Sequence, residues 1–248
     1  MRRLLLAGML AMLWQVSCQA QSTIVLARLA EFPDQHVGGE ILRTVYGRLG
    51  IKVEFSDLPG ARALALSGSG ALDGEVHRVA GITADHPALI QLSTAINAIE
   101  PAVFTTGLDF AVRGWESLRG YQIGIVRGVG SSEAGTRGLP NVERATSLET
   151  LIRMLDVGRI DLFVADAFSG LVKVKQMGLQ DRVRVLSPPL VRIDIYHYLH
   201  RRHAELAKRV EAVLVEMQAS GELAQLRERL IHSILASVAM LPSAAASD

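Results

Sequence analysis

The chain has 248 residues, of which 49% are hydrophobic and 5% are aromatic. That length is enough for one large domain or for two lobes of about 100 residues each, with a core built mainly from aliphatic side chains. The 26 basic residues nearly balance the 25 acidic ones and no basic run stands out, so the composition argues against a nucleic-acid-binding protein.

The first twenty residues have the pattern of an export signal. A basic start at Arg2 and Arg3 precedes the apolar run of residues 4–16, and the segment ends in the small residue Ala20. This pattern predicts a secretory signal peptide (residues 1–20), cleaved after Ala20, and a periplasmic location. The apolar run is too short to span a bilayer comfortably, which disfavours a retained membrane anchor.

The signal segment also contains the chain's one cysteine, Cys18. Gln15 fits the motif that precedes a lipidated cysteine poorly, so lipid attachment at Cys18 is disfavoured. Two of the 26 basic residues lie in the segment, so cleavage leaves 24 basic residues against 25 acidic ones. We therefore expect a mature chain with a formal charge near −1 and without a disulfide.

Strands and helices alternate in the first third of the remaining chain. Residues 23–29 (TIVLARL) are predicted to form a buried strand, and residues 37–49 carry apolar side chains at helical spacing. Strands at 52–55 and 74–79, with a short helix at 61–66 between them, continue the pattern. This order is typical of a parallel sheet that is covered by helices on both faces.

The middle of the chain repeats that order, and the end is helical. The predicted strands are residues 122–126, 142–145, 161–165 and 183–186, and the predicted helices begin near Ser131, near Leu148 and at Ser169. Thr146 and Glu149 have the spacing of a capping box for the second of these helices. A long apolar-periodic segment from Leu206 to Ile234 follows, with an interruption at Gly221.

These elements predict two α/β lobes, each a mostly parallel sheet flanked by helices. The first lobe is expected to comprise residues 21–110 and 193–240, and the second residues 111–192. Two hinge strands, at 102–112 and 192–199, would join the lobes, and residues 241–248 would form a frayed tail. Open parallel sheets bind small molecules beyond the carboxyl ends of their strands, so we expect the binding site between the lobes.

One short phrase occurs in both predicted lobes and ends in opposite charges. Gly70 to Arg78 (GALDGEVHR) and Gly158 to Asp166 (GRIDLFVAD) each place a Gly-x-x-Asp turn before a strand that contains valine. Asp73 and Asp161 are expected to make these turns. If both strands face one cleft, Arg78 and Asp166 offer a cation and an anion, which suits a small zwitterion such as an amino acid.

Three segments resemble those of a known family. WESLRGYQIGIVRGVGSSE, ending at Glu133, resembles the start of the second lobe in the family 3 periplasmic solute-binding proteins. LDVGRIDLFVADAF, ending at Phe168, is similar to that family's Gly-x-Asp, strand, Asp motif, and SGELAQLRERL, ending at Leu230, resembles its usual C-terminal helix. The resemblance covers most of the mature chain. It implies a two-lobed type 2 periplasmic-binding-protein fold and delivery of an amino acid to an inner-membrane ABC permease.

The resemblance also implies roles for particular residues. In that family an arginine of the first lobe and a Ser/Thr turn of the second hold the ligand carboxylate, and an aspartate of the second lobe holds the α-ammonium group. These roles fall on Arg78, on Ser131 and Ser132 beside Gly130, and on Asp166. The run HRVAGITADHPALIQLS lacks the family's Thr-x-x-x-Arg and its aromatic phrase, which leaves a carboxylate of another kind open.

Each of these residues has a structural alternative. Arg78 would also suit a salt bridge between strands, and Asp166 would also suit the cap of the helix that follows it. Ser131 and Ser132 stand where free N–H groups favour an anion, but either is also an ordinary N-cap residue. For these four residues the sequence leaves both the ligand-binding role and the structural role open.

Further residues are expected at or near the cleft. Glu31 and Phe32 follow the first strand, and Phe32 is expected either to stack on the ligand or to pack within its loop. His77 should point away from Arg78, since side chains alternate along a strand, and we expect it to support the site by packing. Arg62 and Glu75 are weaker candidates.

The remaining patterns do not indicate catalysis or a metal. His197, His200 and His203 straddle the passage from a strand to a helix without cysteine or acidic ligands in tight spacing, so we expect no metal and no cofactor. No Gly-x-Ser-x-Gly motif is present. The chain is predicted to be a monomeric binding protein and not an enzyme. A ligand-sensing protein that presents its ligand to a receptor, or a dehydratase-like enzyme, are the alternatives.

Overall fold

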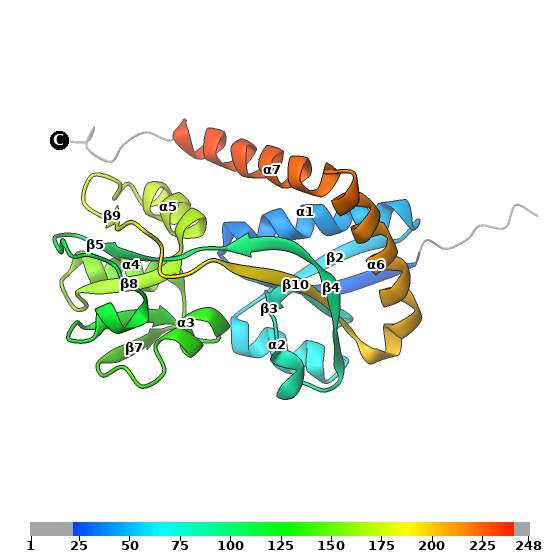
Figure 1. The fold of residues 1–248 in the computed structure, drawn as a ribbon, viewed down its shortest axis with the longest axis horizontal. Coiled ribbons are helices and arrows are strands. Elements are labelled where there is room, and N and C mark those ends of the chain that lie inside the picture. Colours follow the sequence, from blue (N-terminus) through cyan, green and yellow to red (C-terminus); the bar gives the residue numbers. More distant parts are fainter. Residues whose placement is uncertain (1–21, 241–248) are drawn as a thin grey trace, which may run out of the picture.

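The computed structural model describes residues 22–240, which form two lobes that lie side by side, each built around one sheet (Figure 1). The predicted signal peptide with Cys18 and the predicted tail, residues 241–248, lie outside the described residues. Within 22–240, no helix combines the length and the apolar character needed to cross a bilayer.

The sheet of the first lobe has five strands in the order β2-β1-β3-β10-β4. In chain order these are β1 (Thr23–Leu29), β2 (Lys52–Leu58), β3 (Gly74–Val79), β4 (Leu89–Ile99) and β10 (Ile193–His200). Strand β1 is parallel to β2 and β3, whereas β10 runs antiparallel between β3 and β4. The predicted strand–helix alternation is therefore present in this lobe.

The sheet of the second lobe has the order β7-β6-β8-β5-β9. Its strands are β5 (Pro101–Thr105), β6 (Ile123–Val126), β7 (Val142–Ala145), β8 (Leu162–Asp166) and β9 (Arg184–Val185). Strand β6 is parallel to β7 and β8, and β5 is antiparallel to β8 and β9. Each lobe thus has a parallel centre with antiparallel strands at one edge.

Helices cover both sheets. In the first lobe α1 (Pro33–Arg48) and α6 (Ala204–Ala219) lie on one side of the sheet and α2 (Gly60–Gly68) lies on the other (Figure 1). The long helix α7 (Glu222–Ala239) lies over α1 and extends to the second lobe. The helices of the second lobe are α3 (Gly130–Gly135), α4 (Leu148–Asp156) and α5 (Ala167–Gln176). Short 3₁₀ turns occur at Ile82–Ala84, Trp115–Leu118 and Arg201–His203.

The two copies of the repeated phrase occupy equivalent places. Asp73 accepts the backbone N–H of Val25 in β1 at 2.7 Å, and Asp161 accepts the backbone N–H of Gln122, just before β6, at 2.7 Å. The backbone N–H of each aspartate donates in return to the carbonyl of the same residue, at 2.9 Å in both lobes. Both aspartates therefore tie their turn to the neighbouring parallel strand, as their turn positions predicted.

The chain crosses between the sheets at Glu100, between β4 and β5, and returns before β10. The guanidinium Nη1 of Arg192 lies 3.0 Å from Glu100 Oε1, so an ion pair ties the two crossings together. The expected division at residue 110, with a hinge strand at 102–112, differs from this arrangement. Residues 101–105 pair with β8 and β9 and belong to the second sheet.

A buried histidine links the strands of the first lobe to its core. His197 of β10 is fully buried, and its Nδ1 lies 2.7 Å from the carbonyl oxygen of Glu75. With the proton on Nδ1, its Nε2 accepts from the Tyr46 hydroxyl of α1 at 2.8 Å. Burial lowers the pKa of His197 to about 4, so the ring is neutral at pH 7. His197 is thus a core residue whose two nitrogens both have partners.

Two glycines inside helices provide a test of the packing. A Cβ at Gly170 of α5 would lie 2.2 Å from the ring of Phe104, which is itself buried and stacked on Phe163, whereas nothing lies within 4 Å of a Cβ at Gly47 of α1. We expect Gly170→Ala to lower the free energy of unfolding by about 1–3 kcal/mol. Gly47→Ala should raise it by about 0.5–1 kcal/mol through helix propensity. Urea unfolding measures both, and equal effects would contradict the packing.

A candidate ligand cleft between the lobes

A cavity of about 70 Å³ lies between the lobes, where the carboxyl ends of β1 and β3 face the turn before α3. Its polar lining residues are Asp34, Gln35, His77, Arg78 and Ser131, and most of the rest of its wall is aliphatic. Ligand pockets commonly measure about 300–1,000 Å³, so the lobes are nearly closed on one another. The location agrees with the general rule for open parallel sheets.

Arg78 is both a cleft residue and half of a salt bridge. Its side chain is 6% exposed and that of Glu75 is fully buried, with Nη2 2.8 Å from Glu75 Oε2. Its Nε also donates to the same oxygen at 2.9 Å, and Ser67 donates to the other Glu75 oxygen at 2.5 Å. The structural alternative that the sequence left open for Arg78 is therefore realised, within the cavity wall.

The same guanidinium joins the two lobes. Arg78 Nη2 donates to the carbonyl of Gly60 in the first lobe at 3.2 Å, and Nη1 donates to the carbonyl of Gly128 in the second at 3.4 Å. A Cβ on Gly60 would lie 2.7 Å from the Gly128 oxygen, and one on Gly128 would lie 2.7 Å from the nitrogen of Ala61. The lobes thus meet through two glycine backbones, with Arg78 bonded to both.

A second contact between the lobes involves Asp34, near the start of α1. The Ser169 hydroxyl of α5 donates to Asp34 Oδ1 at 2.8 Å, and the backbone N–H of Asp34 donates to Ser169 Oγ at 3.2 Å. Asp34 was not among the site residues predicted from the sequence. Its position soon after the first strand, with Pro33 opening the helix, is the one signal that would have indicated it.

Asp166 caps a helix. Its Oδ2 accepts the backbone N–H of Ser169 at 3.0 Å, and its Oδ1 accepts the backbone N–H of Glu100 at 2.9 Å. It borders a different cavity, beside Asn97 and Arg192 at the hinge. The structure therefore does not bring Asp166 and Arg78 to one cavity, because the backbone at the hinge and at the start of α5 already binds both carboxylate oxygens.

Burial alters the titration of the polar groups near the cleft. It raises the pKa of Asp34 to about 6, and it raises the pKa of Asp166 to about 6 with a further contribution from the charge of Asp34. Burial also lowers the pKa of His77 to about 4. At neutral pH His77 is therefore uncharged, and both carboxyls lose their protons at a higher pH than an ordinary aspartate.

His77 and Arg78 face opposite sides of the sheet, as strand alternation predicts, and both border the cavity at the strand end. His77 packs against Gly38 of α1, whereas Arg78 reaches Gly60 at the start of α2. The Gln35 amide lies 3.0 Å from His77 Nδ1, and His77 Nε2 lies 3.2 Å from the carbonyl oxygen of Asp34. His77 thus fixes the start of α1 beside the cavity.

The predicted turn of the second lobe contributes part of the cavity wall. Gly130 and Ser131 line the cavity, whereas Ser132 is buried and is not among its lining residues. No side chain caps α3, whose N-cap position is Val129. The N-cap alternative for the two serines is therefore not realised, and Ser131 is the one whose position suits ligand contact.

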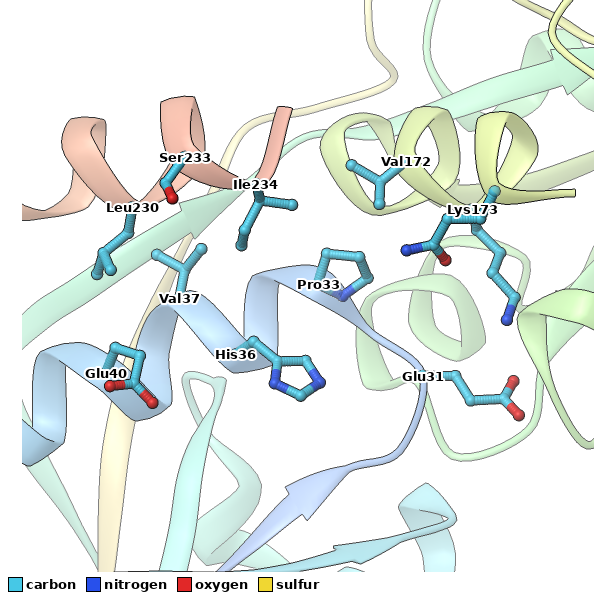
Figure 2. Close-up of a pocket in the computed structure, with 11 residues that line it drawn as sticks. Glu31, Pro33, His36, Val37, Glu40, Val172, Lys173, Leu230, Ser233 and Ile234 are labelled. Carbon is cyan, nitrogen blue, oxygen red and sulfur yellow. The ribbon is translucent and has the colours of Figure 1, made fainter. Parts of the chain in front are cut away.

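Glu31 and Phe32 do not line the cleft. Phe32 is buried among the apolar core residues of the second lobe, so the packing alternative is realised. Glu31 has a positive φ of 69° and lines a groove of about 350 Å³ outside the cleft, between α1, α5 and α7. Figure 2 shows Glu31 on one side of this groove and Leu230 of α7 on the other. Arg62 is exposed and lines neither cavity.

The pKa of Asp34 gives a pH-dependent prediction. Between about pH 4 and 6 this carboxyl binds a proton in the folded chain but is ionised in the unfolded one, so its contribution to stability falls as pH rises. Asparagine does not ionise and still accepts from Ser169. As the pH rises from 4 to 7, we expect the free energy of unfolding of Asp34→Asn to increase by about 1–3 kcal/mol relative to that of the unchanged protein.

Asp57→Asn is the control for this prediction, and its stability difference should change with pH in the opposite direction. Hydrogen bonds from Arg28 lower the pKa of Asp57, so Asp57→Asn should lose stability relative to the unchanged protein as pH rises through the acid range. Urea unfolding at several pH values measures both differences. Parallel stability curves for Asp34→Asn and the unchanged protein would refute the assignment of a raised pKa to Asp34.

No family model matches the chain. An uncharacterised protein of Shewanella oneidensis is 24% identical over 181 residues, which are 70% of this chain and 68% of that protein. Solved structures are similar over most of the described residues. A histidine kinase sensor domain with similarity to periplasmic binding proteins has a TM-score of 0.73 at 19% identity, over 85% of this chain and 96% of that one.

Two binding proteins have similar scores. An ancestral arginine-binding protein bound to arginine has a TM-score of 0.72 at 18% identity, over 85% of this chain and 98% of that one. The amino acid ABC transporter substrate-binding protein AbpA of Streptococcus pneumoniae, bound to L-arginine, has a TM-score of 0.72 at 16% identity, over 86% and 96%. The predicted fold is confirmed: the chain has the two-lobed type 2 periplasmic-binding-protein fold of the solute-binding proteins that its sequence resembles.

Proposed function

We propose that the chain binds a small amine-bearing ligand, in the class of amino acids and related amines, between its lobes and that lobe closure traps it. The observation that carries this proposal is the cavity at the meeting point of the lobes, where buried polar groups converge. Arg78 and Asp34 line it, and each also bonds to the opposite lobe. A ligand held there would touch the groups that close the protein.

The mechanism follows from the contacts between the lobes. A ligand shifts an open–closed equilibrium only by its difference in affinity for the two states. Here the closed state joins the first lobe to the second at Gly128 and at Ser169. A ligand that contacts Asp34 or Arg78 together with the turn at Ser131 would bind the closed state more tightly. Closure is thus the conformational change by which another protein would recognise the ligand-bound state.

We place this activity in the periplasm, with an inner-membrane ABC permease as the partner that receives the ligand. The amino acid ABC transporter substrate-binding proteins of the same fold support this placement. Ligand sensing is the second candidate, because a histidine kinase sensor domain has an equally similar structure. Uptake of labelled ligand by cells with and without the gene separates the two: transport requires a loss of uptake, whereas sensing leaves uptake unchanged.

A thermal-shift screen of amino acids, the matching amines and small organic acids tests the binding proposal. A ligand that binds the folded state raises the melting temperature, by an amount that grows with its concentration above Kd. We expect at least one amine-bearing compound to raise it and to be recovered unchanged after incubation, as a binding protein requires. If no compound of the screen raises the melting temperature, or if the ligand is converted, the proposal fails.

Closure itself can be tested through the glycine contact. In Gly128→Ala the new Cβ would meet the backbone of Ala61 across the cleft, so the lobes should stay apart. We expect a larger radius of gyration in small-angle X-ray scattering and a more than tenfold loss of affinity for the ligand from the screen. Gly138→Ala is the matched control: Gly138 has φ 82° against 80° at Gly128, but nothing lies within 4 Å of its Cβ.

The control separates closure from backbone strain. Both substitutions place alanine at positive φ and should lower stability by a similar amount, of the order of 1 kcal/mol. Only Gly128→Ala should change the scattering and the affinity. If the two variants have the same radius of gyration and the same affinity, the glycine contact plays no part in closure.

A further inference from the structure

The one arginine of the cavity wall is already neutralised. Among the described residues that line the cavity, Asp34, His77 and Arg78 are the titratable ones. Glu75, directly behind Arg78, is fully buried and accepts from both Nε and Nη2 of the guanidinium. The pair as a whole carries no net charge, so Arg78 offers an incoming anion far less attraction than a free guanidinium would.

The donors of Arg78 are also occupied. Besides Glu75, its guanidinium donates to the carbonyls of Gly60 and Gly128. A ligand carboxylate that took these donors would either break the contact between the lobes or lie beside the buried carboxylate of Glu75. Separating Glu75 from Arg78 would leave a buried charge unpaired, which is strongly unfavourable. The cavity as built therefore disfavours a carboxylate.

Asp34, unlike Arg78, has no ion-pair partner of opposite charge among the described residues. It is 7% exposed and lines the cavity, and Ser169 donates to its Oδ1. Within residues 22–240 no lysine or arginine forms an ion pair with Asp34, and the charged form of Asp34 is disfavoured by burial. The nearest ring nitrogen, His77 Nε2, lies 3.6 Å from Oδ2 but belongs to a neutral histidine. Asp34 is thus a buried carboxylate without an ion-pair partner in this part of the chain, although the charge of Arg78, on the same cavity wall, favours its ionised form from a greater distance.

The second carboxyl nearby adds to the negative potential. Asp166 accepts from the backbone of Ser169, whose hydroxyl contacts Asp34, and the charge of Asp34 acts on its titration. No arginine or lysine forms an ion pair with Asp166 in the described part of the chain. Two arginines, Arg192 and Arg227, line the neighbouring cavity that Asp166 borders, and Arg192 is paired with Glu100. Because Glu75 neutralises Arg78, Asp34 is, within residues 22–240, the one acidic group of the cavity wall that has no ion-pair partner.

From this charge distribution we infer that the ligand is a small protonated amine without a free carboxylate, with its ammonium group on Asp34. An ammonium group supplies the cation that Asp34 lacks and donates three hydrogen bonds. The aliphatic wall, which includes Leu29, Ile99 and Ile195, suits a short hydrocarbon substituent. The inference rests on the proposed function and narrows the ligand class of the same cleft, in contrast to the arginine bound by two proteins of this fold.

The test uses pairs of compounds that differ only in the carboxylate. Isobutylamine is compared with valine, cadaverine with lysine and agmatine with arginine, by isothermal titration calorimetry at pH 7.5 with the mature chain. We expect at least one amine to bind at least tenfold more tightly than its amino acid. If an amino acid binds and its amine binds less tightly, the inference is wrong while the proposed function stands. If neither compound of any pair binds and the screen is also negative, the proposed function fails as well.

Two variants test whether Asp34 and Glu75 determine the preference for an amine over its amino acid. Asp34→Asn, which keeps an acceptor for Ser169, should weaken amine binding more than tenfold. Asp109→Asn is the control, because Asp109 is a second-lobe aspartate whose side chain is 87% exposed. Glu75→Gln should release the charge of Arg78 and move the preference toward the amino acid of each pair. Unchanged amine affinity in Asp34→Asn would overturn the inference, even if Glu75→Gln fails to fold.

The pH dependence of binding gives an independent readout. Because burial raises the pKa of Asp34, amine affinity should fall as pH drops below about 6, while the amine itself stays protonated. In Asp34→Asn this fall should be absent. An amine affinity that is constant between pH 5 and pH 7.5 in the unchanged protein would contradict a contact with the Asp34 carboxylate.

Discussion

The buried ion pair between Arg78 and Glu75 organises the inner wall of the cleft. Glu75 holds the guanidinium from behind and is itself held by Ser67, so the fork of Arg78 points at Gly60 and Gly128. A buried pair of this kind contributes little net stability, but losing one partner is costly. Its value here is geometric, because it fixes donors that recognise the backbone of the other lobe. The glycines make that recognition possible, since no side chain stands between the two backbones.

The carboxyl groups at the other contact between the lobes oppose folding at neutral pH. Asp34 and Asp166 have raised pKa values, so their ionisation costs stability as pH rises from about 4 to 6. His77 and His197 have lowered pKa values, so their contribution has the opposite slope over about pH 4 to 6.5. The carboxyls and the histidines thus change the stability with pH in opposite directions.

Local patterns in the sequence were sufficient for the fold and for part of the site. The repeated Gly-x-x-Asp phrase predicted equivalent turns and placed Arg78 near the end of its strand, and the turn of small residues before a helix predicted Ser131 at the cavity. Position just after the first strand, which suggested Glu31 and Phe32, did not predict the cavity wall. Contacts between distant segments could not be predicted. Asp34 meets Ser169 across 135 residues, and the sequence does not say which sheet the short strand β5 joins. Local competition also matters: Ser147, and not Thr146 as expected, caps α4, and the backbone binds both oxygens of Asp166.

The paired crossings at Glu100 and Arg192 form the connection between the lobes. Strands β4 and β10 are hydrogen-bonded neighbours along the first lobe up to the crossing, and the ion pair joins them where they leave the sheet. Under the proposed closure, these paired crossings are the part of the chain that has to bend.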